Sequence, residues 1–293
     1  TMKRFLAVLA ATLIAPTLVA AATPAAAQAA PRNPVAAVQK QVAKKSGVRI
    51  NETTRVTVDG KTLLTAKQVG VVRLDPRRKE FYDVTGRIVV DKESVKLRIL
   101  RAGGKEHYLQ SPLLKDELPE GKTWVSTTEF ASLRGLSTVD GTNPKVLKVL
   151  LAGAKSKVSG GRLDGVRTVA YRGTIPVSRL AKVSPNLRDF DTALKGAKGI
   201  KPPFIRWKLY VGGRDGLPRR LSTELVLFED KKVGSVKLLD DVRYSGWGTK
   251  VKITAPPADQ VIDLKELTSG DIEEVLIPFA DPFKGLKLDT IAE

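Results

Sequence analysis

The feature that most constrains the fold is a series of short segments in which apolar and charged residues alternate. From Phe204 to Val211 every second residue is apolar, and Arg206 and Lys208 lie between them. The same period recurs at 55–58, 69–74, 82–84, 87–91, 94–100, 106–111, 165–177, 221–228 and 236–244. Because side chains point alternately to the two faces of a strand, each segment has one apolar face. Consecutive strands of this kind predict a large, strongly curved antiparallel sheet.

Turn residues separate these segments. Asp59-Gly60 lies between two of them and predicts a two-residue β-hairpin, since glycine readily adopts positive φ. Gly103-Gly104 and the run 212–216 predict two further turns. The paired prolines at 202–203 and 256–257 are typical of loops at strand ends.

Three helices are predicted: Pro34–Lys45, a stretch after Pro112, and a segment from Asn143-Pro144 to about Ala154. They are too few and too clustered to cover both faces of a parallel sheet. We therefore expect an α+β fold with the helices collected on one side of the sheet.

The first residues have the order of a secretory signal peptide. Lys3 and Arg4 precede an apolar run, and small residues follow up to Ala29. A membrane anchor is the alternative, but the run is short and Pro16 interrupts it. We expect residues 1–29 to be cleaved, residues 30–269 to form one domain, and residues 270–293 to form an acidic extension.

The composition excludes several chemistries. The chain has no cysteine and one histidine, His107, so it has no disulfide, thiolate metal site or catalytic thiol. The common hydrolase, metalloprotease, nucleotide-binding and EF-hand motifs are absent. His107 is expected to have a surface or strand-packing role, and the three tryptophans to anchor the core or line a cavity mouth. No enzyme, metal or cofactor is predicted; a hydrolase with an unfamiliar site stays an alternative.

The sequence resembles actinobacterial envelope proteins of the LppX/LprA/LprF/LprG type, which are related in fold to the LolA/LolB lipoprotein carriers. The resemblance extends over about residues 34 to 267 and rests on segments 108–112 (YLQSP), 118–125 (LPEGKTWV), 163–168 (LDGVRT), 171–174 (YRGT), 207–211 (WKLYV), 215–220 (DGLPRR), 244–248 (YSGWG) and 253–259 (ITAPPAD). It implies a half-barrel with helices over the concave face of the sheet and an apolar cavity between them. Several such proteins carry acylated lipids or glycolipids.

The sequence departs from this family where a lipidated cysteine would follow the signal peptide, because Ala29-Ala30-Pro31 stands there. We therefore expect a secreted protein of the envelope or extracellular space, without a membrane anchor. An acyl lipid, glycolipid or fatty acid is the expected ligand, and a monomer the expected state.

The candidate cavity-lining residues are the apolar members of the alternating segments and of the third helix. They are Val56, Val58, Val95, Leu97, Ile99, Leu147, Leu150, Leu151, Ile205, Trp207, Leu209, Leu225 and Leu227. The same residues would also suit a filled core. Alternation shows which face of the sheet these residues share, but it does not show whether the space next to that face is empty or filled. A lipid cavity and a filled core therefore both stay open.

The formal net charge of +19 favours approach to anionic surfaces. The alternative function is therefore a module with a filled core that binds an anionic envelope polymer, a membrane surface or a regulatory partner protein. Nucleic acid is not expected as a partner. Scattered lysines on strand faces are also compatible with a simply solvated surface.

Overall fold

The computed structural model of the protein describes residues 33–77, 79–90, 93–128, 138–184, 187–188, 191–192, 202–230 and 234–267. All of them belong to one compact unit, Pro31–Glu293. The predicted signal peptide and the acidic extension lie outside the described residues. Within the described ranges, no helix is both long and apolar enough to cross a membrane.

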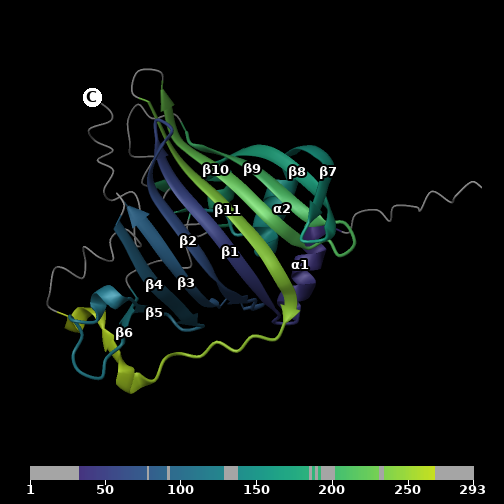
Figure 1. The fold of residues 1–293 in the computed structure, drawn as a ribbon. Coiled ribbons are helices and arrows are strands. Elements are labelled where there is room, and N and C mark those ends of the chain that lie inside the picture. Colours follow the sequence, from purple (N-terminus) through teal and green to yellow (C-terminus); the bar gives the residue numbers. More distant parts are fainter. Residues whose placement is uncertain are drawn as a thin grey trace, which may run out of the picture. The chain divides into compact units, whose positions relative to one another are not determined.

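Twelve strands of the described chain form one sheet (Figure 1). In chain order they are β1 (Gly47–Val58), β2 (Lys61–Arg73), β3 (Phe81–Val90), β4 (Glu93–Ala102), β5 (His107–Gln110), β6 (Trp124–Thr127), β7 (Ala154–Leu163), β8 (Val166–Pro176), β9 (Phe204–Gly212), β10 (Pro218–Asp230), β11 (Gly234–Thr249) and β12 (Val261–Asp263). The order across the sheet is β12-β6-β5-β4-β3-β2-β1-β11-β10-β9-β8-β7. Neighbouring strands are antiparallel except β12 and β6, which are parallel. The predicted large antiparallel sheet is confirmed.

Two tight turns of the same kind connect strand pairs. Asp59 and Gly60 have φ of 52° and 76°, and Asp164 and Gly165 have φ of 49° and 77°. Positive φ at both central residues is the geometry of a type I′ turn, whose twist matches that of the paired strands. The Asp59-Gly60 hairpin was predicted, whereas the Asp164-Gly165 hairpin joins β8 to β7, a strand that was not.

Two helices begin with an Asn-Pro pair. α1 (Pro34–Ala43) is capped by Asn33, whose side chain accepts hydrogen bonds from two backbone N–H groups of the first turn. α2 (Pro144–Ala152) is capped by Asn143, whose side chain accepts one hydrogen bond, from Lys145 N. An asparagine cap satisfies amides that have no partner within the helix, and proline has no amide to satisfy there.

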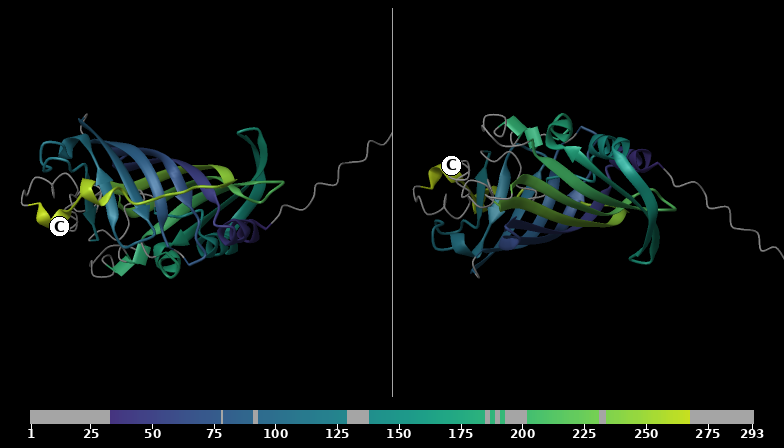
Figure 2. Two further views of the ribbon diagram at one scale, coloured as in Figure 1. Left: turned by 90° about the horizontal axis from the view of Figure 1, so that it is seen from below. Right: turned by 90° about the horizontal axis from the view of Figure 1, so that it is seen from above.

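The helices lie on one side of the sheet, as Figure 2 shows for α1, α2 and α3 (Val177–Ala181). Their buried residues, including Val38, Leu147 and Leu180, belong to the same apolar cluster as the inward residues of the strands. We call this side of the sheet the inner face and the opposite side the outer face. Collection of the helices on one side agrees with the prediction.

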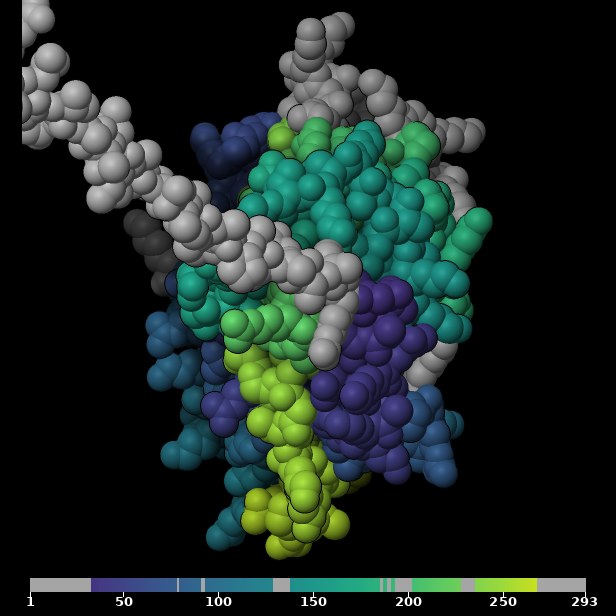
Figure 3. Space-filling view, turned by 90° about the vertical axis from the view of Figure 1, so that its right-hand side faces the viewer, coloured from purple at the N-terminus to yellow at the C-terminus, as the bar shows by residue number. Residues whose placement is uncertain are grey.

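The chain after β11 covers part of the outer face. Ile253 packs with Leu100 of β4 and Trp124 of β6 in a second, smaller apolar cluster. Near the end of β11, Gly248 lies beside Gln41 of α1, and Figure 3 shows α1 in purple next to the yellow-green end of β11. The 3-10 turns η2 (Ala258–Gln260) and η3 (Leu264–Glu266) flank β12 at the end of the described chain.

Some predicted elements were wrong. The helix after Pro112 is a single 3-10 turn, η1 (Pro112–Leu114), since Pro119 and Gly121, with φ of 80°, follow closely and do not suit a helix. The segments 82–84 and 87–91 join into one strand, β3, across Gly86. Strands β6, β7 and β12 and the short helix α3 were missed.

Candidate ligand-binding face of the sheet

The thirteen residues predicted to line a cavity come together on the inner face. Ten of them are buried in one apolar cluster, and Val58, Val95 and Leu151 are partly buried and packed against it. They come from β1, β4, β9, β10 and α2, although β4 and β9 are separated by five strands in the sheet. Inward residues of the intervening strands, such as Val84 of β3, Ile50 of β1 and Leu238 of β11, belong to the same cluster and connect β4 to β9.

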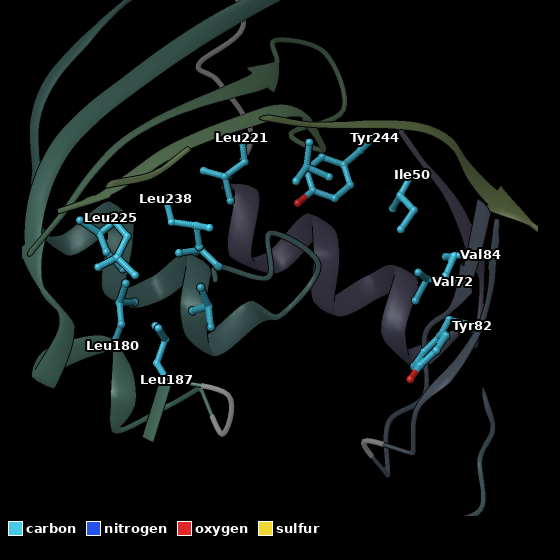
Figure 4. Close-up of a cluster of buried hydrophobic side chains, with 14 of the residues drawn as sticks. Ile50, Val72, Tyr82, Val84, Leu180, Leu187, Leu221, Leu225, Leu238 and Tyr244 are labelled. Atoms are coloured by element: carbon cyan, nitrogen blue, oxygen red, sulfur yellow. The ribbon is translucent and has the colours of Figure 1, made fainter. Parts of the chain in front are cut away.

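Figure 4 shows part of this cluster. Leu221 and Leu225 of β10 and Leu238 of β11 point toward the helices, and Leu180 of α3 lies close to Leu225. Leu225 and Leu180 are both completely buried. At about 25 cal/mol per Å² of apolar area removed from water, such contacts hold the helices on the sheet.

A row of polar residues crosses this apolar face, and Asp240 of β11 is its centre. Asp240 is only 4% exposed. Its Oδ1 accepts a hydrogen bond of 2.8 Å from Thr54 Oγ1, and its Oδ2 accepts bonds of 3.2 Å from Thr223 Oγ1 and of 3.0 and 2.9 Å from Thr138 N and Oγ1. Burial raises the pKa of the Asp240 carboxyl above its ordinary value, although these hydrogen bonds oppose the rise.

A second buried carboxyl lies beside the first. Glu52 of β1 is 3% exposed, and its Oε2 accepts a hydrogen bond of 2.8 Å from Gln68 Nε2 on β2. Its Oε1 lies 3.3 Å from Thr54 Oγ1, the hydroxyl that also donates to Asp240. Because Thr54 has one hydroxyl proton, it donates to only one of the two carboxyls at a time.

Asp240 and Tyr244 hold the chain that leads into α2. Thr138 binds Asp240 through both its backbone and its hydroxyl, and Gly141 N donates to Tyr244 Oη at 3.2 Å. Both acceptors lie on β11, so the start of α2 is tied to the inner face by three hydrogen bonds. The sequence signal for this arrangement is Asp240, an acidic residue on the apolar face of a strand. The sequence analysis did not predict that Asp240 faces inward.

Trp207 is the one aromatic residue among the predicted lining positions. It lies opposite Gly173 of β8 and Thr223 of β10, and its indole Nε1 is buried with no hydrogen-bond partner among the described residues. A Cβ on Gly173 would come within 2.7 Å of Trp207 Cζ2, so glycine provides the room for the indole ring.

His107 has a packing role. It is 1% exposed at the start of β5, and its Nδ1 lies 2.7 Å from the hydroxyl of Tyr82, which is completely buried. The predicted strand-packing role agrees with this position, and the surface alternative was wrong. Tyr82 belongs to the large apolar cluster, so His107 packs beside that cluster.

No protein-family model and no curated protein matches the chain. Solved structures do match. The chain is structurally similar to LprF from Mycobacterium bovis, as the sequence resemblance predicted. The TM-score is 0.38 at 16% identity, over 78% of this chain and 100% of LprF.

Two other solved structures also match. A putative outer membrane lipoprotein-sorting protein domain from Vibrio parahaemolyticus has a TM-score of 0.23 at 9% identity, over 74% of this chain and 93% of that one. A LolA superfamily protein from Nitrosomonas europaea has a TM-score of 0.22 at 7% identity, over 74% of this chain and 94% of that one. At these scores, function has to be argued from the residues of this chain itself.

Proposed function

We propose that the protein is a non-enzymatic lipid carrier of the cell envelope or extracellular space that holds an acyl chain between the inner face and the helices. The sheet would act as the strongly curved wall of a half-barrel, with the helices over its concave face. The observation that carries the proposal is the gathering of the thirteen candidate residues, from four strands and one helix, into one apolar cluster.

The driving force is the removal of the acyl chain from water. Each buried methylene contributes about 0.8 kcal/mol, so a chain of about 16 carbons gains roughly 12 kcal/mol on entering an apolar site. Leu147 and Leu150 of α2 are completely buried against the sheet. An entering chain would therefore replace contacts that α2 now makes with the strands, and α2 would move outward to admit it.

The buried polar row around Glu52 and Asp240 would limit where the acyl chain can lie on the inner face. Glu52 and Asp240 divide an otherwise apolar face, and an acyl chain offers no hydrogen bonds to their oxygens. A ligand hydroxyl or amide close to Thr54 or Thr223 could bond to this row. The carrier would then hold the apolar chain on either side of the row and the polar group of the ligand at it.

The first experiment is native mass spectrometry of the secreted protein purified without detergent. We expect a mass excess of lipid size, and the same protein stripped of lipid should take up a fluorescent fatty acid. Absence of both the mass excess and the uptake refutes the proposal.

A variant on α2 tests the position of the site. Leu150→Gln adds a polar group at a buried position of the cluster, so we expect fatty-acid uptake to be about 5- to 150-fold weaker, since burying an unpaired amide costs about 1–3 kcal/mol. Lys148→Gln changes an exposed position of the same helix and should leave uptake unchanged. Thermal unfolding of both variants shows whether the lost uptake reflects the site or the fold; equal uptake by folded Leu150→Gln contradicts this location.

A further inference from the structure

A groove of about 590 Å³ crosses the outer face, on the side of the sheet opposite the helices. Residues from β1 and from β7 to β11 line it. Strand register places its outward side chains in two parallel rows. The first row is Thr53, Asp241, Ser222, Lys208 and Arg172, and the second is Arg55, Leu239, Glu224, Arg206 and Thr174. The groove therefore runs across the strands and between these rows.

Asp240 faces inward, and the two acidic residues on the outward side of the groove are already paired. Glu224 forms an ion pair of 2.8 Å with Arg206, and Asp241 forms one with Arg220. Hydrogen bonding to Asp241 raises the pKa of the Arg220 guanidinium, so Arg220 is charged at any physiological pH. Both outward carboxylates of the groove thus have an arginine beside them.

Three cations at the other end of the groove have no such partner. Lys208 of β9 lies directly opposite Arg172 of β8, and Lys155 lies at the bulge of β7 next to them. None of the three has a carboxylate partner among the described residues, and Lys208 Nζ instead lies 4.5 Å from the ring centroid of Tyr210. Like charges placed opposite each other in a ladder destabilise a sheet, so stability does not explain this cluster.

We propose that this groove binds a linear polymer that carries phosphate groups, with Lys155, Arg172 and Lys208 as its principal contacts. The tetrahedral phosphate offers several acceptor oxygens, which cations from three strands can approach from different sides. The two rows each cross five strands spaced about 4.8 Å apart, a length of about 19 Å, which suits several consecutive repeat units better than one ion. Arg55 of β1 offers a further contact at the far end.

The small extent of the basic cluster favours a polymer over a bilayer. Lys155, Arg172 and Lys208 lie together at one end of the groove, whereas a bilayer presents a broad surface. A different basic ladder, Lys67, Arg87 and Lys96, lies fully on the exposed outer side of β2, β3 and β4 and outside the groove. A bilayer would contact such an exposed ladder, and a polymer in the groove would not.

This second ladder supplies a matched control. The groove variant is Lys155→Gln/Arg172→Gln/Lys208→Gln and the control variant is Lys67→Gln/Arg87→Gln/Lys96→Gln, so each removes three cations from the outer face. The probe is fluorescein-labelled linear polyphosphate, followed by fluorescence anisotropy over a series of salt concentrations. Phosphatidylglycerol/phosphatidylcholine vesicles are a second probe, followed by co-sedimentation.

We expect the groove variant to bind polyphosphate at least about tenfold more weakly, and the slope of log K against log salt to fall by about one unit for each cation removed. The control variant should lose less than about threefold. Arg172→Gln alone, at an exposed position, should show a smaller loss of the same kind and serves if the triple variant is poorly folded. Fatty-acid uptake should be unchanged in all of them, so this test is independent of the acyl site.

Three outcomes overturn the inference. The first is that the wild-type protein does not bind polyphosphate. The second is that the groove and control variants lose polyphosphate affinity equally, and the third is that the groove variant loses binding to the vesicles alone. Equal losses would mean that net charge and not the groove attracts the polymer. Binding to the vesicles alone would assign the groove to a membrane surface.

Discussion

Thr54→Val perturbs the buried polar row with little change in side-chain volume. Valine cannot donate the 2.8 Å hydrogen bond that Thr54 Oγ1 gives to Asp240 Oδ1. A hydrogen bond to a charged group contributes about 1.5–3 kcal/mol, and one between neutral groups about 0.5–1.5 kcal/mol. We therefore expect the free energy of unfolding to fall by about 2 kcal/mol when Asp240 is ionised and by about 1 kcal/mol when it is protonated.

The sign of the pH dependence follows from the direction of the pKa shift. Burial raises the pKa of Asp240 in the folded protein above its value in the unfolded chain. Its contribution to stability is thus fully present below the unfolded pKa and is lost as the pH rises through the folded pKa. Thr54→Val removes a hydrogen bond that favours the ionised form, so its destabilising effect should grow over the same rise in pH. Glu52 shares the Thr54 hydroxyl, and its carboxyl is the other acidic group in contact with it.

The assay is urea unfolding of the wild type and the variant at neutral and mildly acidic pH. Thr85→Val, at an exposed position on β3, is the matched control and should change stability by less than about 0.5 kcal/mol at both. In an Asp240→Asn/Glu52→Gln background, which removes both acidic partners of the Thr54 hydroxyl, the pH dependence of the Thr54→Val effect should disappear. A Thr54→Val effect that is equal at both pH values, or no larger than that of the control, refutes the role assigned to the buried carboxyl.

Two substitutions test the backbone of the fold. Gly70→Ala places a Cβ at 2.2 Å from Asp83 O, a backbone atom that cannot move aside, so it should lower the free energy of unfolding by more than about 2 kcal/mol. Its control is Gly213→Ala, whose Cβ meets nothing closer than 3.5 Å and should cost less than about 0.5 kcal/mol in the same unfolding measurement. Asn143→Ala removes the cap that accepts from Lys145 N and should lower the free energy of unfolding by about 1 kcal/mol; an unchanged midpoint would mean that the cap does not hold the start of α2.

Strands with one buried and one exposed face were predicted well from the sequence, and β9 is the clearest case. β7 was missed because it is the edge strand and its side chains are mostly exposed, so Lys155, Ser156 and Lys157 follow one another without apolar alternation. The dipeptide Asp164-Gly165, of the same type as Asp59-Gly60, was the available signal. The four residues of β6 are all buried, so no alternation marks it, and β12 has only three residues.

The candidate site was predicted in part. The apolar residues of the inner face were identified because alternation defines a face. The polar row was not, since Glu52 and Thr54 look like ordinary polar residues of a strand until the burial of their neighbours is known. The groove on the outer face depends on five strands being in register, which no single segment specifies.

The sequence by itself determined where the strands turn, which of their residues share a face, and where α1 and α2 begin, because turn residues, alternation and caps act over a few neighbouring positions. Only the tertiary structure decided which residues meet. Thr54 and Asp240 are 186 positions apart, and Lys208 reaches Arg172 only through the pairing of β9 with β8. A period of two assigns a side chain to a face of the sheet, but its partner depends on strand order and register, which are set by how the whole apolar cluster packs.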